Sequence, residues 1–272
     1  MMHELSRGSV LALAFASIAG CGSNNNTTPM PDAHVVAVDA PPAAGDHITT
    51  YSWHFSDIAF NVAGNDTVET ATGCPGAPYD TAAVISQASS SMGTPVGSCD
   101  PGSTTSGTCF VDLYDCTALT GTETLPPAYY LQWLAITNHT GTSVYADTAS
   151  ALIDLTADNS ITADILNDGG YFQFDWALRD AANAPITCAD LANDGISLDS
   201  TVAGGTNGLS DVFTCTDLSG ITSGLPAGDY VLSASILNAA QQALGTTSVV
   251  GNKTIAAQNA ITDLGTITIQ LN

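Results

Sequence analysis

Stretches of the sequence about 100 residues apart are near copies of each other. Six residues recur 100 positions later without a gap: Tyr130, Ile136, Asn138, Asn159, Ile161 and Thr162 have identical counterparts at Tyr230, Ile236, Asn238, Asn259, Ile261 and Thr262. Such self-similarity is typical of a repeated structural unit. The chain is therefore predicted to fold as two copies of one unit, and each copy constrains the interpretation of the other.

Both copies contain strands with large apolar residues at alternate positions, a period that indicates β-structure. The first strand of each is marked by Tyr51, Trp53 and Phe55, or by Phe174, Trp176 and Leu178. The inward residues of a later, longer strand are predicted to be Tyr130, Gln132, Leu134 and Ile136, or Tyr230, Leu232, Ala234 and Ile236. A short apolar pair lies between the two cysteines of each copy, and Ala83 with Ile85 are aligned with Ile196 and Leu198.

Turn signals every dozen or so residues separate these strands. Residues 235–244 have a pattern that also fits an amphipathic helix, but their counterpart, residues 137–141, is turn-like, so a hairpin is predicted in both copies. No other segment has a sustained helical period. The sequence therefore predicts an all-β protein with two tandem antiparallel β-sandwiches, at residues 47–168 and 169–272.

The junction between the two predicted modules leaves alternatives open. The second module ends on the apolar strand 267–271, whereas the first passes from Ile161 almost directly into the aromatic strand 171–176. Either Ile165 and Leu166 form a vestigial closing strand, or one strand serves both modules. Both alternatives imply a very short linker and hence a fixed relative orientation.

Insertions distinguish the first module from the second. The segment from Trp53 to Cys74 spans 21 positions against 12 from Trp176 to Cys188, and the two cysteines that follow are 42 apart in the first module against 27 in the second. The larger insertion, a loop rich in Gly, Ser and Thr, contains two additional cysteines.

Six cysteines remain in the chain after Cys21, an even number that predicts disulfides in an oxidising compartment. Cys188 and Cys215 are the only pair in the second module, and Cys74 and Cys116 are their counterparts. The predicted bridges are therefore Cys74–Cys116, Cys99–Cys109 and Cys188–Cys215. A metal site made from these cysteines is disfavoured, because they form no Cys-x-x-Cys pair and have no histidine at ligand spacing.

The charge of the chain excludes some classes of partner. The 272 residues include 26 acidic and only 3 basic side chains, so the formal net charge is -23. A charge of this sign repels nucleic-acid phosphates and anionic lipid head groups. We expect no nucleic-acid partner and no electrostatic docking to membranes.

The N-terminus has the features of a secretory signal, with Arg7 followed by an apolar run too short to span a bilayer. Ile18-Ala19-Gly20-Cys21 then resembles the lipobox of bacterial lipoproteins. The resemblance implies a signal peptide at residues 1–20, lipidation of Cys21, and attachment to the membrane through acyl chains. Gly22, in place of an aspartate, favours the outer membrane. Residues 21–46, rich in Asn, Thr, Pro and Ala, are predicted to be a flexible tether.

The two modules resemble the Ig-like and transthyretin-like (carboxypeptidase-regulatory-like) sandwiches of bacterial surface proteins. The resemblance rests on a Trp followed by paired cysteines and on Leu225-Pro226-Ala227-Gly228-Asp229-Tyr230, which leads into an alternating strand. It implies a tyrosine corner, in which the Tyr hydroxyl donates a hydrogen bond to nearby backbone. The first module departs from the motif, because Ala128 replaces Gly228. The architecture by itself implies no particular activity.

Catalytic motifs are missing from the sequence: it has no His-Glu-x-x-His, no Gly-x-Ser-x-Gly and no phosphate-binding glycine loop. His54 and His139 are expected to face solvent. No cofactor is expected, with calcium as the one alternative. Asp154, Asp158, Asp164 and Asp168 form the densest acidic cluster, but the nearby EF-hand-like spacings lack a third-position ligand and the closing Glu.

Exposed aromatic residues are the remaining sign of a binding surface. Trp133 corresponds to Ser233 and falls on the strand face opposite Tyr130, with Tyr129 beside it, so both are candidates for stacking on sugars or docking a partner. The alternative is that Trp133 packs under the inserted loop or against the second module. Taken together, the sequence predicts a lipid-anchored envelope protein with a non-enzymatic structural or binding role. A carbohydrate- or adhesin-type binder and a hydrolase without a recognisable motif are the alternatives.

Overall fold

The computed structural model describes residues 45–191 and 193–272, which belong to one compact unit. Strands dominate this part of the chain, and its helical structure consists of three 3-10 turns, η1 (Cys116–Ala118), η2 (Cys188–Asp190) and η3 (Cys215–Asp217). Among the described residues, no helix has the length and apolar character needed to cross a membrane. The signal at 1–20 and Cys21 lie outside the described residues, as does the tether up to residue 44.

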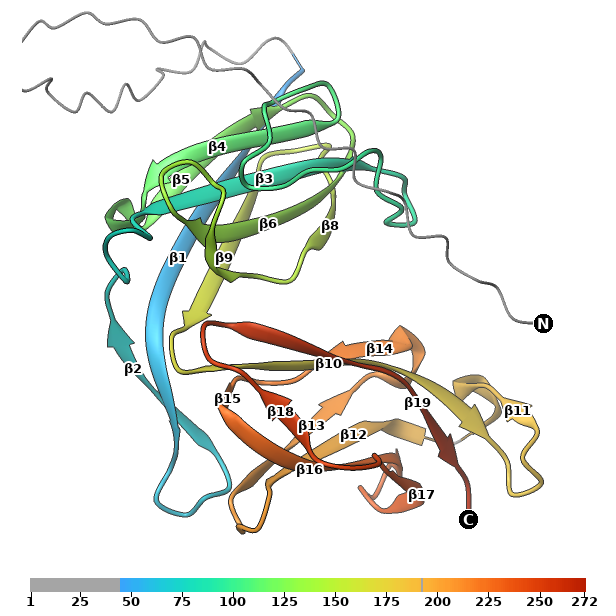
Figure 1. Cartoon of the computed structure of the whole chain (residues 1–272). Coiled ribbons are helices and arrows are strands. Elements are labelled where there is room, and N and C mark those ends of the chain that lie inside the picture. Colours follow the sequence, from blue (N-terminus) through green and yellow to red (C-terminus); the bar gives the residue numbers. More distant parts are fainter. Residues whose placement is uncertain (1–44, 192) are drawn as a thin grey trace, which may run out of the picture. The chain divides into compact units, whose positions relative to one another are not determined.

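Nine strands form the first module (Figure 1). They are β1 (His47–Phe60), β2 (Thr67–Thr72), β3 (Thr81–Ser89), β4 (Cys109–Asp115), β5 (Thr120–Leu125), β6 (Tyr129–Thr137), β7 (Val144–Asp147), β8 (Ala151–Asp154) and β9 (Asn159–Leu166). In one sheet, β1 pairs with β2, β5 and β9; in the other, the order is β4-β3-β6-β7, and β8 also pairs with β6.

The second module repeats this arrangement with ten strands. They are β10 (Gly169–Arg179), β11 (Pro185–Ile186), β12 (Asn193–Val202), β13 (Gly208–Phe213), β14 (Ser219–Ile221), β15 (Leu225–Pro226), β16 (Gly228–Asn238), β17 (Ala243–Ser248), β18 (Lys253–Ile255) and β19 (Ala260–Gln270). Here β14 and β15 together take the place of β5. The prediction of an all-β fold with antiparallel sheets is confirmed.

The closing strands β9 and β19 pair in parallel with the opening strands β1 and β10. The first module therefore has a complete closing strand of eight residues, β9, which ends at Leu166, and β10 begins at Gly169. Neither a two-residue vestige nor a shared strand describes the junction. The ambiguous stretch at 235–244 is a hairpin between β16 and β17, as predicted.

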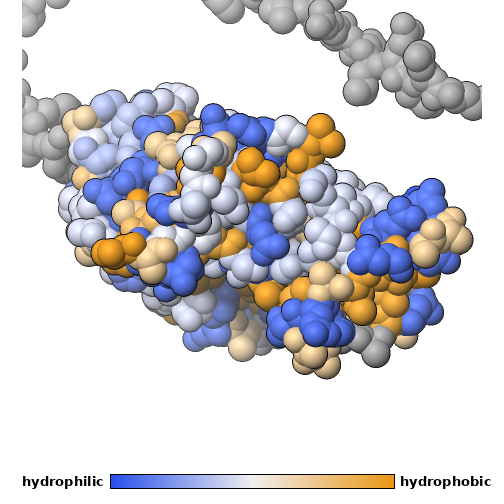
Figure 2. All heavy atoms as spheres, turned by 90° about the horizontal axis from the view of Figure 1, so that it is seen from below, coloured by the Kyte–Doolittle hydropathy of each residue, from blue (hydrophilic) through white to orange (hydrophobic). Residues whose placement is uncertain are grey.

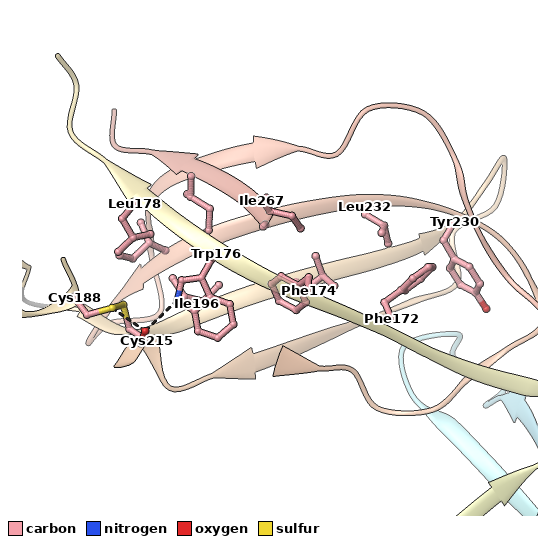
Figure 3. Close-up of a cluster of buried hydrophobic side chains, with 14 of the residues drawn as sticks. Phe172, Phe174, Trp176, Leu178, Cys188, Ile196, Cys215, Tyr230, Leu232 and Ile267 are labelled. Carbon is pink, nitrogen blue, oxygen red and sulfur yellow. Dashed lines mark hydrogen bonds between the residues drawn. A yellow bond between two sulfur atoms is a disulfide. The ribbon is translucent and has the colours of Figure 1, made fainter. Parts of the chain in front are cut away.

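Each core contains the predicted tryptophan and tyrosine in equivalent hydrogen bonds. Trp53 and Trp176 donate from Nε1 to the carbonyl oxygens of Cys116 and Cys215, at 2.8 and 3.0 Å. Figure 3 shows Trp176 beside the disulfide at one end of the second core and Phe172 beside Tyr230 at the other.

The predicted tyrosine corner is present in both modules. Tyr130 and Tyr230 donate their hydroxyl protons to the carbonyl oxygens of Pro126 and Pro226, at 3.0 and 2.6 Å. Burial raises the pKa of Tyr230 to about 12. Gly228 has a φ of 159°, while the first module forms its corner with Ala128 at that position.

The three disulfides are Cys74–Cys116, Cys99–Cys109 and Cys188–Cys215, as predicted from the repeat. The alignment of Ala83 and Ile85 with Ile196 and Leu198 is wrong by one residue, because Ala82 and Val84 are the counterparts. Ala82 and Val84 pair with Ile136 and Leu134 and lie in the first core, whereas Ala83 and Ile85 lie on the opposite face of β3. A strand has a side-chain period of two, so a slip of one residue exchanges its faces. The error arose because β3 is apolar on both faces.

Candidate functional site

A cleft of about 430 Å³ lies on the outer face of the sheet that contains β3 and β6, and we call it the Trp133 cleft. Trp133 points away from the core side of β6, as predicted, because the inward residues Leu134 and Ile136 alternate with it. The lining comes from β3, β6, β7 and the inserted loop: Gln87, Cys99, Asp100, Pro101, Leu131, Trp133, Val144, Asp147, Thr148 and Ser150.

Trp133 is only partly exposed because it packs on a small second core. This cluster consists of Ala83, Ile85 and Ala135 together with the cysteines of the Cys99–Cys109 bridge, and Val111 and Trp133 pack against it. Both sequence interpretations therefore hold in part: the indole packs under the inserted loop, and it also lines an open cleft. Fixing an aromatic ring by packing reduces the entropy that a ligand-binding surface loses when it forms a complex.

The inserted loop is held against the sheet by contacts on two sides. Gln87 donates from Nε2 to the carbonyl oxygen of Gly97 at 2.7 Å. Pro101 lies so close to the β6–β7 turn that a Cβ atom on Gly141 would be 2.4 Å from the Pro101 carbonyl oxygen. Gly141 also has a φ of 67°, a conformation that favours glycine. The loop thus forms a fixed wall of the cleft.

Another wall of the cleft is formed by Asp147 and the residues that follow it. Thr148 exchanges two hydrogen bonds with Leu134 of β6: its N–H donates to the Leu134 carbonyl at 3.0 Å, and its Oγ1 accepts from the Leu134 N–H at 3.1 Å. Asp147 is accessible from the cleft, yet desolvation by its neighbours raises the pKa of its carboxyl group. With Asp100, it gives the cleft two carboxyl groups as hydrogen-bond acceptors.

The second module has no equivalent surface. The positions that correspond to Ala83, Ile85, Trp133, Ala135 and Val111 are occupied by polar residues, namely Ser197, Asp199, Ser233, Ser235 and Ser210. The outer face of this sheet is thus apolar only in the first module, where the inserted loop packs on it. On the face of the molecule in Figure 2, apolar residues gather in several groups separated by hydrophilic ones.

Tyr129, the other predicted binding residue, does not line the Trp133 cleft. It lies four residues from Trp133, at the start of β6, opposite Asp154 of β8. A hydrogen bond with Asp154, and then the charge of that carboxylate, raises the pKa of Tyr129. The structure therefore separates the two aromatic residues that the sequence placed in one surface.

The four aspartates considered for calcium do not form a metal site in this structure: within residues 45–191 and 193–272, no three His, Cys, Asp or Glu side chains are grouped to hold a metal ion. Asp158, Asp164 and Asp168 follow one extended segment at spacings of four to six residues, or roughly 13–20 Å. The four aspartates have different neighbours: Tyr129 for Asp154, His47 and Ile48 for Asp158, His54 for Asp164 and Ile58 for Asp168.

His54 and His139 are exposed, as expected. His54 lies 3.6 Å from Asp164, and both side chains are more than half accessible to solvent. His139 is exposed in the β6–β7 turn. Neither lines the Trp133 cleft.

Sequence reasoning missed Asp147, Gln87 and Asp100 as cleft residues. One signal in the sequence is a difference between the two copies at Asp147. Asp147 pairs with Ala135, and its counterpart in the second module, paired with Ser235, is Thr246. Like Trp133 against Ser233, Asp147 marks a place where the two copies differ.

No family model matches the chain, and no curated protein matches its sequence. Solved structures of low similarity include the minor pilin GBS52 of Streptococcus agalactiae, at 12% identity and a TM-score of 0.26, over 83% of this chain and 96% of the pilin. The TIE protein of Bacillus anthracis aligns at 10% identity and a TM-score of 0.23, over 82% of this chain but only 34% of that one. The C-terminal fragment of the pilus adhesin SpaC from Lactobacillus rhamnosus GG aligns at 11% identity and a TM-score of 0.19, over 82% and 97%. TM-scores this low carry no argument about function.

Proposed function

We propose that this protein is a non-enzymatic binding protein of the bacterial cell envelope, and that the Trp133 cleft of its first module holds a neutral carbohydrate. The observation that carries the proposal is the cleft itself: an aromatic residue on a rigid strand, between a disulfide-closed loop and an acidic wall. The second module, which shares the fold, has polar residues in place of this surface. The cleft is therefore an addition to the fold and is not required by it.

The chemistry of the lining favours a sugar over other ligands. The apolar floor, Trp133 and Leu131, fits the C–H face of a pyranose ring. The carboxyl groups of Asp147 and Asp100 accept hydrogen bonds from hydroxyl groups, and the side chains of Thr148 and Ser150 both donate and accept. Two carboxylates in a chain of net charge -23 disfavour anionic ligands.

Display at the envelope is supported by the sequence. The three disulfides require an oxidising compartment, and the lipobox-like Ile18-Ala19-Gly20-Cys21 provides for acylation of Cys21. Replacing Cys21 with Ser should release the protein from the outer-membrane fraction and abolish incorporation of labelled palmitate. Retention of the variant in that fraction would contradict lipid anchoring.

Binding is tested by applying the full chain to an array of neutral and acidic glycans. We expect neutral glycans to be bound, and we expect Trp133→Ala to reduce affinity by about 10- to 100-fold, the loss of roughly 1–3 kcal/mol for an aromatic stacking contact. Tyr129→Ala is the matched control, an aromatic residue on the same strand outside the cleft, and it should leave affinity unchanged. An equal loss in both variants, or binding confined to acidic glycans, would rule out the proposed site.

The alternative of a hydrolase is tested with the same ligands. Asp147 combines a raised pKa with a place in the cleft near a second carboxyl group, two features that also occur in glycoside hydrolases. Bound glycans should be recovered intact after long incubation. Release of new reducing ends that is lost in Asp147→Asn would favour the hydrolase.

A further inference from the structure

Asn259, in the turn before β19 of the second module, is buried against the first module. Its residue exposure is 1%, and it has a left-handed backbone with a φ of 58°. Asparagine tolerates this conformation better than most residues. The neighbouring Gln258, with a φ of 68°, is exposed.

Four hydrogen bonds join Asn259 to the junction and to the Trp133 cleft. Its N–H donates to the carbonyl oxygens of Leu166 and Gly169, at 2.7 and 2.9 Å. Its side-chain Oδ1 accepts from the N–H of Leu166 at 2.9 Å. Its Nδ2 donates to the carbonyl oxygen of Asp147 at 2.8 Å. Both polar atoms of the Asn259 side chain thus bond to residues of the first module.

A second contact between the modules comes from the β1–β2 hairpin, the shorter of the two insertions. Phe60 packs against the core of the second module, and Ile58 is 3% exposed. At the hairpin tip, the carbonyl oxygen of Gly64 accepts a hydrogen bond from the N–H of Gly208 at 2.7 Å. The modules are thus joined at two separate places.

We propose that Asn259 is a positioning residue for the Trp133 cleft: the second module fixes the Asp147 wall through the bond to the Asp147 carbonyl. The second module then contributes to binding without touching the ligand. This consequence for affinity rests on the proposed function, whereas the positioning of the wall does not.

The positioning is measured without a ligand, on the full chain. Asn259→Gly retains the backbone N–H bonds and suits a positive φ, so it removes only the side-chain bonds. We expect about fivefold faster amide hydrogen exchange at Thr148, the factor that corresponds to the loss of one hydrogen bond. Acrylamide quenching of the tryptophan fluorescence should also increase. Trp53 and Trp176 are 0% and 4% exposed, so the increase reports on Trp133.

Gln258→Gly is the matched control, a change in the same turn at an exposed residue with the same sign of φ, and it should leave both measurements unchanged. Asn259→Asp keeps the acceptor for the Leu166 N–H and removes the donor to Asp147, so it should reproduce the effect on Thr148. Unchanged exchange and quenching in both Asn259 variants would overturn the proposal, as would equal effects in Gln258→Gly.

Ligand binding then separates this inference from the proposed function. With a neutral glycan that the array identifies, Asn259→Gly should weaken binding by about fivefold, the same hydrogen-bond factor. If no glycan binds the unmodified protein, the proposed function fails while the exchange result still decides the positioning. If glycans bind equally to both proteins, the position of the Asp147 wall does not contribute to affinity and this consequence fails, while the exchange result again decides the positioning.

Discussion

The two modules share one arrangement of strands, yet the centres of their cores are chemically different. In the second module, Phe174 and Leu232 fill this region, and Phe172 continues it toward Tyr230. The equivalent residues in the first module are Thr49, Tyr51 and Gln132, all nearly inaccessible to solvent. The same fold is therefore compatible with an apolar core centre and with a polar one.

The polar centre of the first module is a connected group of hydrogen bonds. Gln132 donates from Nε2 to Thr49 Oγ1 and Ser86 Oγ, at 3.2 and 3.0 Å, and Ser86 donates to the carboxyl group of the buried Glu123. The hydroxyl group of Tyr51 lies 3.5 Å from the same carboxyl oxygen. Burial, followed by the charge of Glu123, raises the pKa of Tyr51. Buried polar groups are tolerated when they bond to one another, and this explains how the first module keeps the fold.

The difference teaches that the fold depends on the features the copies share at their ends. Both have the Trp-to-cysteine hydrogen bond, the disulfide and the tyrosine corner. The features that differ lie in the core centre and on the outer face. Both insertions belong to the first module, one contacting the second module and the other forming a wall of the Trp133 cleft.

The largest expected effect comes from exchanging core residues between modules. Leu232→Gln places an amide among apolar side chains and should lower the free energy of unfolding by about 3 kcal/mol. Gln132→Leu leaves the Thr49 and Ser86 hydroxyls to bond elsewhere, so we expect a smaller loss of about 1 kcal/mol. Denaturant unfolding of both variants measures the difference. The interpretation of the two cores would fail if Gln132→Leu were the more damaging change.

A smaller effect is expected at the corners, where the modules are alike. Tyr130→Phe and Tyr230→Phe each remove one hydrogen bond to a proline carbonyl, and each should cost about 1 kcal/mol. Because the bond of Tyr230 is shorter, at 2.6 Å against 3.0 Å, its loss should be at least as large. Thermal unfolding of the two variants tests this equivalence, and no destabilisation in either would show that the corner is not a stabilising feature.

The smallest effect is expected for Asp147, which has Thr246 as its counterpart. Its raised pKa means that the folded state favours the protonated carboxyl group, so this contribution to stability is present below about pH 4 and is lost as the pH rises through the raised pKa. Asp147→Asn should therefore stabilise the protein near pH 7, by less than about 0.5 kcal/mol because water still reaches the group. The free energies of unfolding of Asp147→Asn and of the unmodified protein should differ at pH 7 and converge at pH 3. A stabilisation by Asp147→Asn that occurs only at pH 3 would contradict the raised pKa.

Much of the fold was predictable because each copy of the repeat can be compared with the other. Two copies of one pattern resolved the hairpin at residues 235–244 and chose one disulfide pairing among fifteen. They also located the corner tyrosines. The orientation of Trp133 followed from the period of a strand. These features are local, or are repeated in both copies.

The one-residue error in β3 shows where pattern reasoning stops. Every residue from Thr81 to Gln87 is buried, so alternation is absent and the sequence does not distinguish the two faces. Pairing with β6 decides the matter, by placing Val84 opposite Leu134. The polar centre was likewise visible only as a lone Gln132 on the inward face, because its partners come from other strands.

The sequence by itself determined the repeat, the all-β class, the bridges and the corners, since each depends on residue types at fixed spacings. Tertiary structure alone decided that Asp147 and Trp133 line the same cleft, that the four aspartates stay apart, and that Asn259 reaches Asp147 across 112 positions of sequence. Such contacts depend on which strands pair and which turns meet. Local patterns fix the face on which a side chain lies, while the packing of distant segments fixes what it touches.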